Sequence, residues 1–306
     1  MKTKLKFLGF LILVAAAIIP AQAKTIAVTF TIISPPYLTM VRDAIVAEAA
    51  KTPGLKLDVR EYNNEVPKQM ADMPDLMGKH PDALIIFIQD GAAGAKVNEM
   101  AVAAHIPVVY LLSVPSVDKL PANAAVVSSN GYVAGRLQMH KLAALMGGKG
   151  NLVILRGTDT STDTKGRTQG VKEIAAKYPN IHLIDEGSAI WNRPDADKLV
   201  TSWLEKGDKI DAVAANNDDM ALGAVDALER AKVAHYFVGG VDGSASGLAE
   251  MQKGRLTLTV LQNAAAQGRE AVDDAVSLMN GKAVQQYDWV PFELVTKEVL
   301  PAYLPK

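Results

Sequence analysis

The sequence alternates short apolar runs with longer amphipathic stretches, and this alternation occurs twice along the chain. Apolar runs bounded by Gly, Pro or Asn predict buried strands, and apolar residues spaced three or four apart predict helices. The first set contains expected strands at Thr25–Thr31, Leu55–Tyr62, Ala83–Ile88 and Val108–Leu112, with expected helices at Tyr37–Lys51, Lys68–Lys79 and Ala92–Ala104. Such alternation is typical of an α/β fold in which helices cover both faces of a parallel sheet.

The second set begins after one long helix and the turn Gly147-Gly148-Lys149-Gly150. Its expected strands are Asn151–Leu155, Ile181–Asp185, Ala212–Ala215, Phe237–Val241 and Thr257–Leu261. Its expected helices are Gly166–Tyr178, Asp195–Glu205, Asp218–Ala231 and Ser244–Lys253. Two α/β units of similar size predict two lobes that face each other.

The first 23 residues have the pattern of a cleavable export signal. Three lysines precede the apolar stretch Phe7–Ile19, and the small-x-small sequence Ala21-Gln22-Ala23 follows it. The apolar stretch is too short for a membrane span, which needs about 20 residues. We therefore expect cleavage after Ala23 and a chain beginning at Lys24 in a Gram-negative periplasm.

Composition excludes several classes of function. The chain has no cysteine, which rules out disulfides, thiol catalysis and cysteine metal sites. The five histidines are scattered without metal-ligand spacing, so we expect neither a metal nor a cofactor. Without residues 1–23 the chain has 29 basic and 33 acidic side chains and no polybasic block, which argues against a nucleic-acid partner.

Hydrogen-bonding and aromatic side chains recur directly after the predicted strands. In open parallel sheets, ligands bind beyond the carboxyl ends of the strands. A polyhydroxylated ligand needs hydrogen-bond partners and an aromatic face on which its C–H groups stack. The candidate ligand-binding residues are Ser34, Tyr37, Asp90, Ser113, Trp191, Asn217, Asp242 and Gln262, with Gln89 beside Asp90.

Each candidate also has a structural interpretation. Asn217 is well placed to cap the helix that begins near Met220. Asp242 and Gly243 form a common turn pair, and Trp191 is large enough to belong to a core. The recurrence of such residues at one end of both sheets favours a binding site.

The segment Ala215-Asn216-Asn217-Asp218-Asp219-Met220-Ala221-Leu222-Gly223-Ala224 resembles periplasmic sugar-binding proteins of the ribose-binding type, a group of type I periplasmic binding proteins. Val238–Gly243, Thr257–Gln262 and Ile106-Pro107-Val108 share this resemblance, which extends from Thr25 to about Val295. It implies two Rossmann-like lobes joined by a three-strand hinge, with the ligand in a cleft between them. Regulators of the lac-repressor type share the pattern, but they carry a helix-turn-helix where this chain has its export signal.

The resemblance also implies where the lobes divide. The chain is expected to cross at Ser129-Asn130, at Gln262-Asn263 and near Trp289. The N-terminal lobe then comprises residues 24–130 plus 263–288, and the C-terminal lobe comprises 131–262 plus 289–306. A monomer is the usual state for this class.

Ligand contacts carry over unevenly from the family. Asn217, Asp242 and Gln262 match residues that contact sugar hydroxyls, and Trp191 matches a stacking aromatic. Lys165 stands where the family usually has an arginine, with Arg167 as the alternative for that role.

The first lobe departs from the family pattern. Ser34 replaces a common asparagine, and Pro36 and Tyr37 occupy two aromatic positions. Leu112-Ser113 replaces an Asp-Arg pair that grips the ring oxygen and anomeric hydroxyl of ribose or galactose. Serine cannot supply the bidentate charged donor of arginine. A deoxysugar, a modified sugar, a polyol or another small polar solute therefore fits better than ribose or galactose.

The resulting hypothesis is the periplasmic solute receptor of an ABC importer, with a permease in the inner membrane as its partner. A periplasmic sensor component that docks on a receptor kinase or chemoreceptor uses the same closed form and stays an alternative. An enzyme is disfavoured, because Gly243-Ser244-Ala245-Ser246-Gly247 lacks the spacing of a hydrolase nucleophile elbow. A glycosidase carboxylate pair among Asp218, Asp219 and Asp242 competes with the binding and capping roles of these residues.

Overall fold

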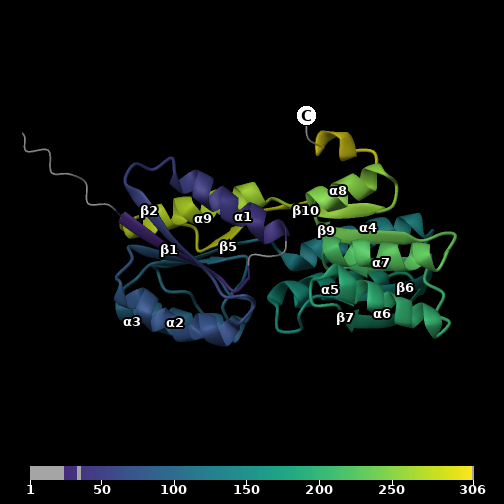
Figure 1. Ribbon diagram of the computed structural model, residues 1–306, viewed down its shortest axis with the longest axis horizontal. Coiled ribbons are helices and arrows are strands. Elements are labelled where there is room, and N and C mark those ends of the chain that lie inside the picture. The colour runs from purple at the N-terminus through teal and green to yellow at the C-terminus, as the bar shows by residue number, and fades with distance from the viewer. Residues whose placement is uncertain (1–23, 33–35, 305–306) are drawn as a thin grey trace, which may run out of the picture.

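A computed structural model describes residues 24–32 and 36–304 of the chain. These residues form two α/β lobes that lie side by side, each built on a six-stranded sheet with helices on both faces (Figure 1). The predicted fold class is confirmed. The predicted export signal and Ser34 lie outside the described residues.

The first sheet has the strand order β11-β5-β4-β3-β1-β2, and all its neighbouring strands run parallel. Helices α1 and α9 cover one face and α2 and α3 cover the other, which gives two separate apolar layers. The strands are β1 (Lys24–Phe30), β2 (Leu55–Glu61), β3 (Ala83–Phe87), β4 (Val108–Leu111), β5 (Ala124–Ser128) and β11 (Tyr287–Trp289). The helices are α1 (Pro36–Ala49), α2 (Val66–Gly78), α3 (Gly91–Ala104) and α9 (Ala264–Met279).

The second sheet has the order β12-β10-β9-β8-β6-β7, in which only the pairing of β12 with β10 is antiparallel. Helices α4 and α5 pack on one face, and α6, α7 and α8 pack on the other. The strands are β6 (Lys149–Arg156), β7 (Asn180–Ser188), β8 (Ala212–Ala215), β9 (Phe237–Asp242), β10 (Leu258–Gln262) and β12 (Phe292–Val295). The helices are α4 (Gly131–Leu145), α5 (Thr162–Ala175), α6 (Arg193–Glu205), α7 (Asp218–Arg230) and α8 (Ala245–Gln252), followed by a 3-10 turn at Leu300–Ala302.

The chain changes sheet after β5, after β10 and between β11 and β12. Asn130 and Asn263 cap the helices that follow the first two changes. Ser129 Oγ donates a hydrogen bond to the Val290 carbonyl at 2.7 Å, which ties the first crossing to the third. Trp289 pairs with Ser128 and so belongs to the first sheet, not to the second lobe as its expected boundary implied. The remaining lobe boundaries stay a prediction.

Helices α4 and α5 approach each other closely because glycines lie at their contact. A Cβ atom added to Gly135 of α4 would lie 2.0 Å from the Arg167 carbonyl oxygen of α5. A Cβ atom on Gly170 would lie 2.4 Å from the Tyr132 carbonyl oxygen of α4. This close contact fixes the position of α5, and α5 contributes to the cleft described next.

The predicted helix at Gly166–Tyr178 begins earlier in the structure, at Thr162. Ser161 caps it by accepting a hydrogen bond from the Thr164 amide. The apolar periodicity starts only at Val171, which is why the pattern placed the start too late. The earlier start brings Asp163 and Arg167 onto one helical face, since residues four apart are neighbours.

Candidate functional site

A cavity lies between the two lobes, at the carboxyl ends of the strands of both sheets. It has a volume of about 580 Å³, including the part open to solvent. The first lobe lines it with Tyr37, Leu38, Phe87, Gln89, Leu112 and Ser113. The second lobe lines it with Ser161, Thr162, Asp163, Arg167, Trp191, Asn217, Asp242 and Gln262. Six of the predicted ligand-binding residues are therefore brought together here: Tyr37, Ser113, Trp191, Asn217, Asp242 and Gln262.

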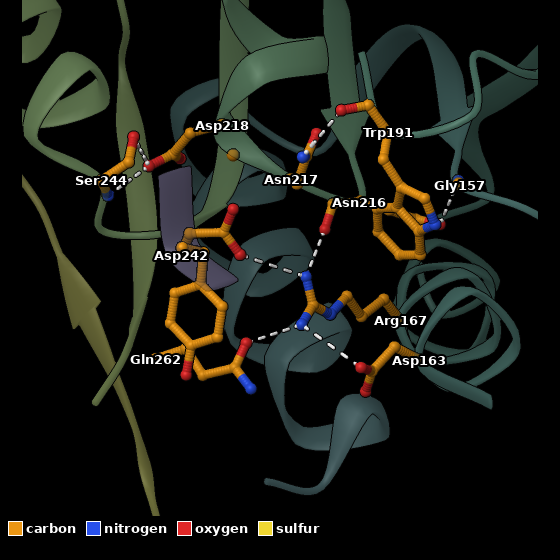
Figure 2. A network of polar contacts seen from close by, with 12 residues as sticks. Gly157, Asp163, Arg167, Trp191, Asn216, Asn217, Asp218, Asp242, Ser244 and Gln262 are labelled. Atoms are coloured by element: carbon orange, nitrogen blue, oxygen red, sulfur yellow. Dashed lines mark hydrogen bonds and ion pairs between the residues drawn. The ribbon is translucent and has the colours of Figure 1, made fainter. Parts of the chain in front are cut away.

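Arg167 lies at the centre of the polar contacts (Figure 2). Its Nη1 donates a hydrogen bond to the Asn216 carbonyl at 2.6 Å, and its Nη2 donates to Gln262 Oε1 at 2.8 Å. Its guanidinium also lies 3.5 Å from an Asp242 oxygen and 3.9 Å from an Asp163 oxygen. The side chain is only 4% exposed, so these contacts hold a buried positive charge at the cavity wall.

The structure favours Arg167 over Lys165 as the basic residue of the site. Lys165 lies on the exposed side of α5 and does not line the cavity. Two residues along a helix turn the side chain by about 200°, so one helix cannot present both residues to the same cavity.

Asp242 ends β9 in a backbone conformation that is rare for a residue with a side chain. Its φ is +125°, and Gly243 follows with φ +67°. Strained backbone of this kind is tolerated mainly at functional sites. The strain places the Asp242 carboxyl against Arg167 at the cavity, where it is buried (Figure 2).

Burial raises the pKa of both cavity carboxyls, Asp242 and Asp163, because the charged form loses hydration. Arg167 opposes this effect in both cases. Burial also raises the pKa of the Tyr37 hydroxyl well above its usual value. That hydroxyl donates a hydrogen bond to Gln267 Oε1, so Tyr37 presents a neutral ring beside the cavity.

Asn217 caps a helix and also lines the cavity. Its Oδ1 accepts a hydrogen bond from the Met220 amide, which caps α7. Its Nδ2 donates to the Trp191 carbonyl at 3.2 Å, and the residue lines the cavity. The capping interpretation and the binding interpretation are therefore compatible.

Trp191 is placed by its backbone and by a neighbouring glycine. Its φ of +69° is in the left-handed region, and its indole packs where a Cβ of Gly157 would otherwise lie. The indole Nε1 donates to Thr158 Oγ1 at 2.8 Å, and Thr158 Oγ1 donates to Gln89 Oε1 at 3.2 Å. This chain of hydrogen bonds connects the second lobe to the first across the cavity. It also leaves the indole ring partly exposed.

Asp90 does not line the cavity. Its carboxylate accepts hydrogen bonds from the Ala92 and Ala93 amides and so caps α3. Its backbone forms an isolated bridge with Ser161, a second contact between the lobes. Gln89, one residue earlier, lines the cavity in its place.

Three apolar residues that the sequence argument did not propose as contacts also line the first-lobe wall. They are Leu38, Phe87 and Leu112. Ser113 lies beside them, but it is buried and its Oγ donates a long hydrogen bond of 3.4 Å to the Leu111 carbonyl. The first-lobe wall is therefore largely carbon, and the second-lobe wall carries the charged groups.

Ser161, Thr162 and Asp163 also line the cavity without having been proposed from the sequence. Their positions follow from the early start of α5. The sequence contained a signal for this earlier helix start. A serine such as Ser161 favours the N-cap position, and an acidic residue such as Asp163 favours the first turn that follows.

Asp218 has a structural role apart from the cavity. Its carboxylate accepts hydrogen bonds from the Ser244 amide, Ser244 Oγ and Thr259 Oγ1, at 2.6–2.9 Å. These contacts join α7 to the start of α8 and to β10. Among residues 24–32 and 36–304, no cluster of three His, Asp or Glu side chains offers a metal site. No helix in the same residues is long and apolar enough to cross a membrane.

Comparison with known proteins identifies relatives of this chain. The family model described as "Periplasmic binding protein domain" matches residues 26–283 of this chain. A putative rhizopine-binding protein of Rhizobium meliloti is 33% identical, covering 97% of this chain and 99% of the relative. A xylitol-binding protein of Mycolicibacterium smegmatis is 32% identical, covering 81% and 71%. The crystal structure of an ABC transporter solute-binding protein from Bacillus halodurans with bound myo-inositol superposes with a TM-score of 0.87. It is 33% identical and covers 92% of this chain and 97% of that one. The chain belongs to the periplasmic binding protein family.

Proposed function

We propose that this protein is a periplasmic receptor that binds a small polyol, or a sugar lacking the usual anomeric contacts, for an ABC importer. The ligand would lie in the cavity between the lobes. Asn217, Asp242, Gln262 and Arg167 would contact its hydroxyls, and Trp191 would stack on its C–H face. We propose binding without chemical turnover, as in the relatives named above, which are binding proteins.

The observation that carries this proposal is the unequal polarity of the two cavity walls. Hydroxyl groups need donors and acceptors, which the second-lobe wall supplies from Arg167, Asp242 and Gln262. The first-lobe wall presents Leu38, Phe87 and Leu112. By the family resemblance, Leu112-Ser113 replaces the Asp-Arg pair that contacts the ring oxygen and anomeric hydroxyl of a sugar. A carbocyclic or acyclic polyol has no ring oxygen or anomeric hydroxyl that such a wall would leave unpaired.

Two relatives support the same ligand class, although others bind ribose. They are a xylitol-binding protein and a solute-binding protein with myo-inositol bound. Xylitol is acyclic and inositol is carbocyclic, so neither contains a ring oxygen. We transfer this feature, and not the individual compound, to the present chain.

A thermal-shift screen tests the proposal. The melting temperature of the purified protein would be measured with inositols, linear polyols, deoxysugars and the parent aldoses. Leucine, a solute of similar size that has no hydroxyl groups, is the control. A ligand at a hundred times its Kd adds about 2.7 kcal/mol to the free energy of unfolding, an easily measured shift. We expect the largest shifts with polyols. A response to aldoses alone would contradict the argument from Leu112 and Ser113.

Delivery to an importer, export to the periplasm and a monomeric state are parts of the same proposal. Stimulation of ATP hydrolysis by a reconstituted permease, seen only with liganded protein, would support transport. Stimulation of a receptor kinase instead would support the sensor alternative. Size-exclusion chromatography with light scattering reports the oligomeric state.

A further inference from the structure

The backbone at Asp242 and Gly243 has a conformation that needs support from outside the turn. Asp242 has a φ of +125°, the largest positive φ of any described residue other than glycine, and Gly243 follows with +67°. A residue with a side chain stays in such a region only when the surrounding contacts hold it there. The direction of the Asp242 carboxyl depends on this backbone, so the contacts that hold the turn also bear on the cavity.

The two amides that follow Asp242 are both held by one carboxylate, that of Asp218 (Figure 2). The Ser244 amide donates to Asp218 Oδ2 at 2.7 Å. The Gly243 amide donates to Thr259 Oγ1 at 3.2 Å, and Thr259 Oγ1 in turn donates to Asp218 Oδ1 at 2.6 Å. Asp218 therefore holds one amide of the turn directly and the other through Thr259.

The direction of these hydrogen bonds is fixed. An ionised carboxylate only accepts, so the Thr259 hydrogen points to Asp218 and the hydroxyl oxygen is left to accept from the Gly243 amide. Burial raises the pKa of Asp218 to about 6, while hydrogen bonds from Thr259 and Ser244 oppose this rise. Asp218 is therefore ionised at pH 7.5. Asp218 and Thr259 are fully buried, so water cannot replace a partner that is lost.

The chain around the carboxylate leaves room for it and for little else. A Cβ atom on Gly240 would lie 2.2 Å from Asp218 Oδ1, and a Cβ atom on Gly247 would lie 2.4 Å from Asp218 Oδ2. Glycines thus let β9 and α8 approach the carboxylate from two sides. Neither Asp218 nor Thr259 lines the cavity, so any influence on a ligand must act through the turn.

We infer that Asp218 and Thr259 are positioning residues for the binding site, because they hold the Asp242-Gly243 turn so that the Asp242 carboxyl faces the cavity. This inference rests on the proposed function, in which Asp242 contacts the ligand. Loss of the Thr259 hydroxyl leaves the Gly243 amide without an acceptor. The turn then relaxes from its strained conformation and takes the Asp242 carboxyl out of place.

The test removes the hydrogen bonds and keeps the size of the side chains. Isothermal titration at pH 7.5 gives the Kd of myo-inositol and of xylitol. We expect Thr259→Val to raise the Kd of whichever compound binds at least tenfold, and Thr259→Ser, which keeps the hydroxyl, to stay within about threefold of the wild type. Asp218→Asn should also raise the Kd at least tenfold, because one amide oxygen cannot serve three donors and the amide nitrogen only donates. Thermal melting verifies that each variant folds.

Thr257→Val is the matched control. Thr257 Oγ1 accepts a hydrogen bond from the Val238 amide at 2.9 Å, near the opposite end of β9. This variant loses the same kind of hydrogen bond on the same pair of strands, and its Kd should stay within about threefold of the wild type. Amide hydrogen exchange of the ligand-free protein, measured by NMR, gives a second readout. Thr259→Val should accelerate exchange at Gly243 at least tenfold and leave Val238 unchanged, and Thr257→Val should do the reverse.

The outcomes separate this inference from the proposed function. An unchanged Kd in Thr259→Val or Asp218→Asn overturns the inference and leaves the polyol receptor standing. An equal rise in Thr257→Val or in Thr259→Ser also overturns it, because the effect would then be general destabilisation or lost packing. If neither polyol binds the wild type, the proposed ligand class is wrong, and equal Gly243 exchange in wild type and Thr259→Val then overturns the inference independently. Should Thr259→Val not fold, Thr259→Ala removes the same oxygen without placing a methyl group against the carboxylate and takes its place in both measurements.

Discussion

Replacing Gly135 with alanine should destabilise the second lobe and weaken ligand binding together. The added Cβ would lie 2.0 Å from the Arg167 carbonyl oxygen and 2.8 Å from the Val171 amide nitrogen, and both atoms belong to the backbone of α5. The two helices would have to separate by about 1 Å to reach even the 3.0 Å below which Cβ contacts are essentially never seen. Overpacking of this kind costs about 1–3 kcal/mol, against at most about 1 kcal/mol gained from the helix propensity of alanine.

The effect on binding follows from the position of Arg167 on the displaced helix. Its hydrogen bonds of 2.6 and 2.8 Å would lengthen to the limit of hydrogen-bonding distance if α5 moved by about 1 Å. In the proposed function Arg167 also donates to a ligand hydroxyl, and loss of that one charged hydrogen bond on displacement of α5 is worth about 1.5–3 kcal/mol, so the ligand Kd should rise about tenfold or more. Thermal unfolding measures the first effect and calorimetric titration the second.

A series of glycine variants shows whether the reasoning is correct. The nearest atom to an added Cβ lies at 2.4 Å for Gly170, 3.2 Å for Gly166 and 3.4 Å for Gly131. The loss of stability should therefore decrease in the order Gly135, Gly170, Gly166, Gly131. Gly78→Ala, at the end of α2 with no atom within 4 Å, is the control and should be neutral. A Gly135→Ala protein as stable as the wild type would refute the close packing of α4 on α5.

Three further predictions concern the site and the first lobe. Asp242→Ala and Asn217→Ala should each weaken binding by roughly 1–3 kcal/mol in titrations, and Asn217→Ala should also cost about 1 kcal/mol of stability because it removes the α7 cap. Normal binding by both variants would show that the site is placed wrongly. Trp191→Phe should abolish the ligand-induced fluorescence change, since Trp203 is buried in the second-lobe core and Trp289 is on β11; a preserved change would contradict stacking on Trp191. Burial, with repulsion from Asp288, Glu270 and Asp273, raises the pKa of the Asp274 carboxyl on α9 to about 7. Because folding raises that pKa, protonation of Asp274 favours the folded protein. Its contribution to the free energy of unfolding is complete below about pH 4 and is lost as the pH rises through 7. In urea titrations, Asp274→Asn should therefore be more stable than the wild type at pH 8 by roughly 1 kcal/mol, a value reduced because the carboxyl is only half-buried. Near pH 4 the two proteins should be equally stable. An unchanged pH profile would contradict the raised pKa.

The strands that carry the cavity residues could be predicted because each is a buried apolar run with a polar residue at its carboxyl end. β8 followed by Asn217, β9 ending at Asp242 and β10 ending at Gln262 all have this form. The sequence separation between them is irrelevant, since a parallel sheet brings the carboxyl ends of neighbouring strands to one edge.

Elements that depend on distant partners were harder to predict. β11 has only three residues, Tyr287–Trp289, and exists because it pairs with Val126–Ser128 of β5. No local pattern marks such a strand, because the pairing partner lies about 160 residues earlier. The boundary at Trp289 was misplaced for this reason.

Leu112-Ser113 in the first lobe and Asp163 in the second together shape the polarity of the cavity. The Leu112-Ser113 pair removes a carboxylate and a guanidinium together from the first-lobe wall, which leaves the charge of that wall unchanged. The second-lobe wall keeps Arg167 but faces it with Asp163 as well as Asp242, and the early start of α5 is what turns Asp163 toward the cavity. A ligand with several hydroxyls can donate hydrogen bonds to the acceptors of such a cavity. The cap at Ser161 lies five residues ahead of Gly166, the predicted start of this helix, and it therefore determines which polar groups of α5 line the cavity.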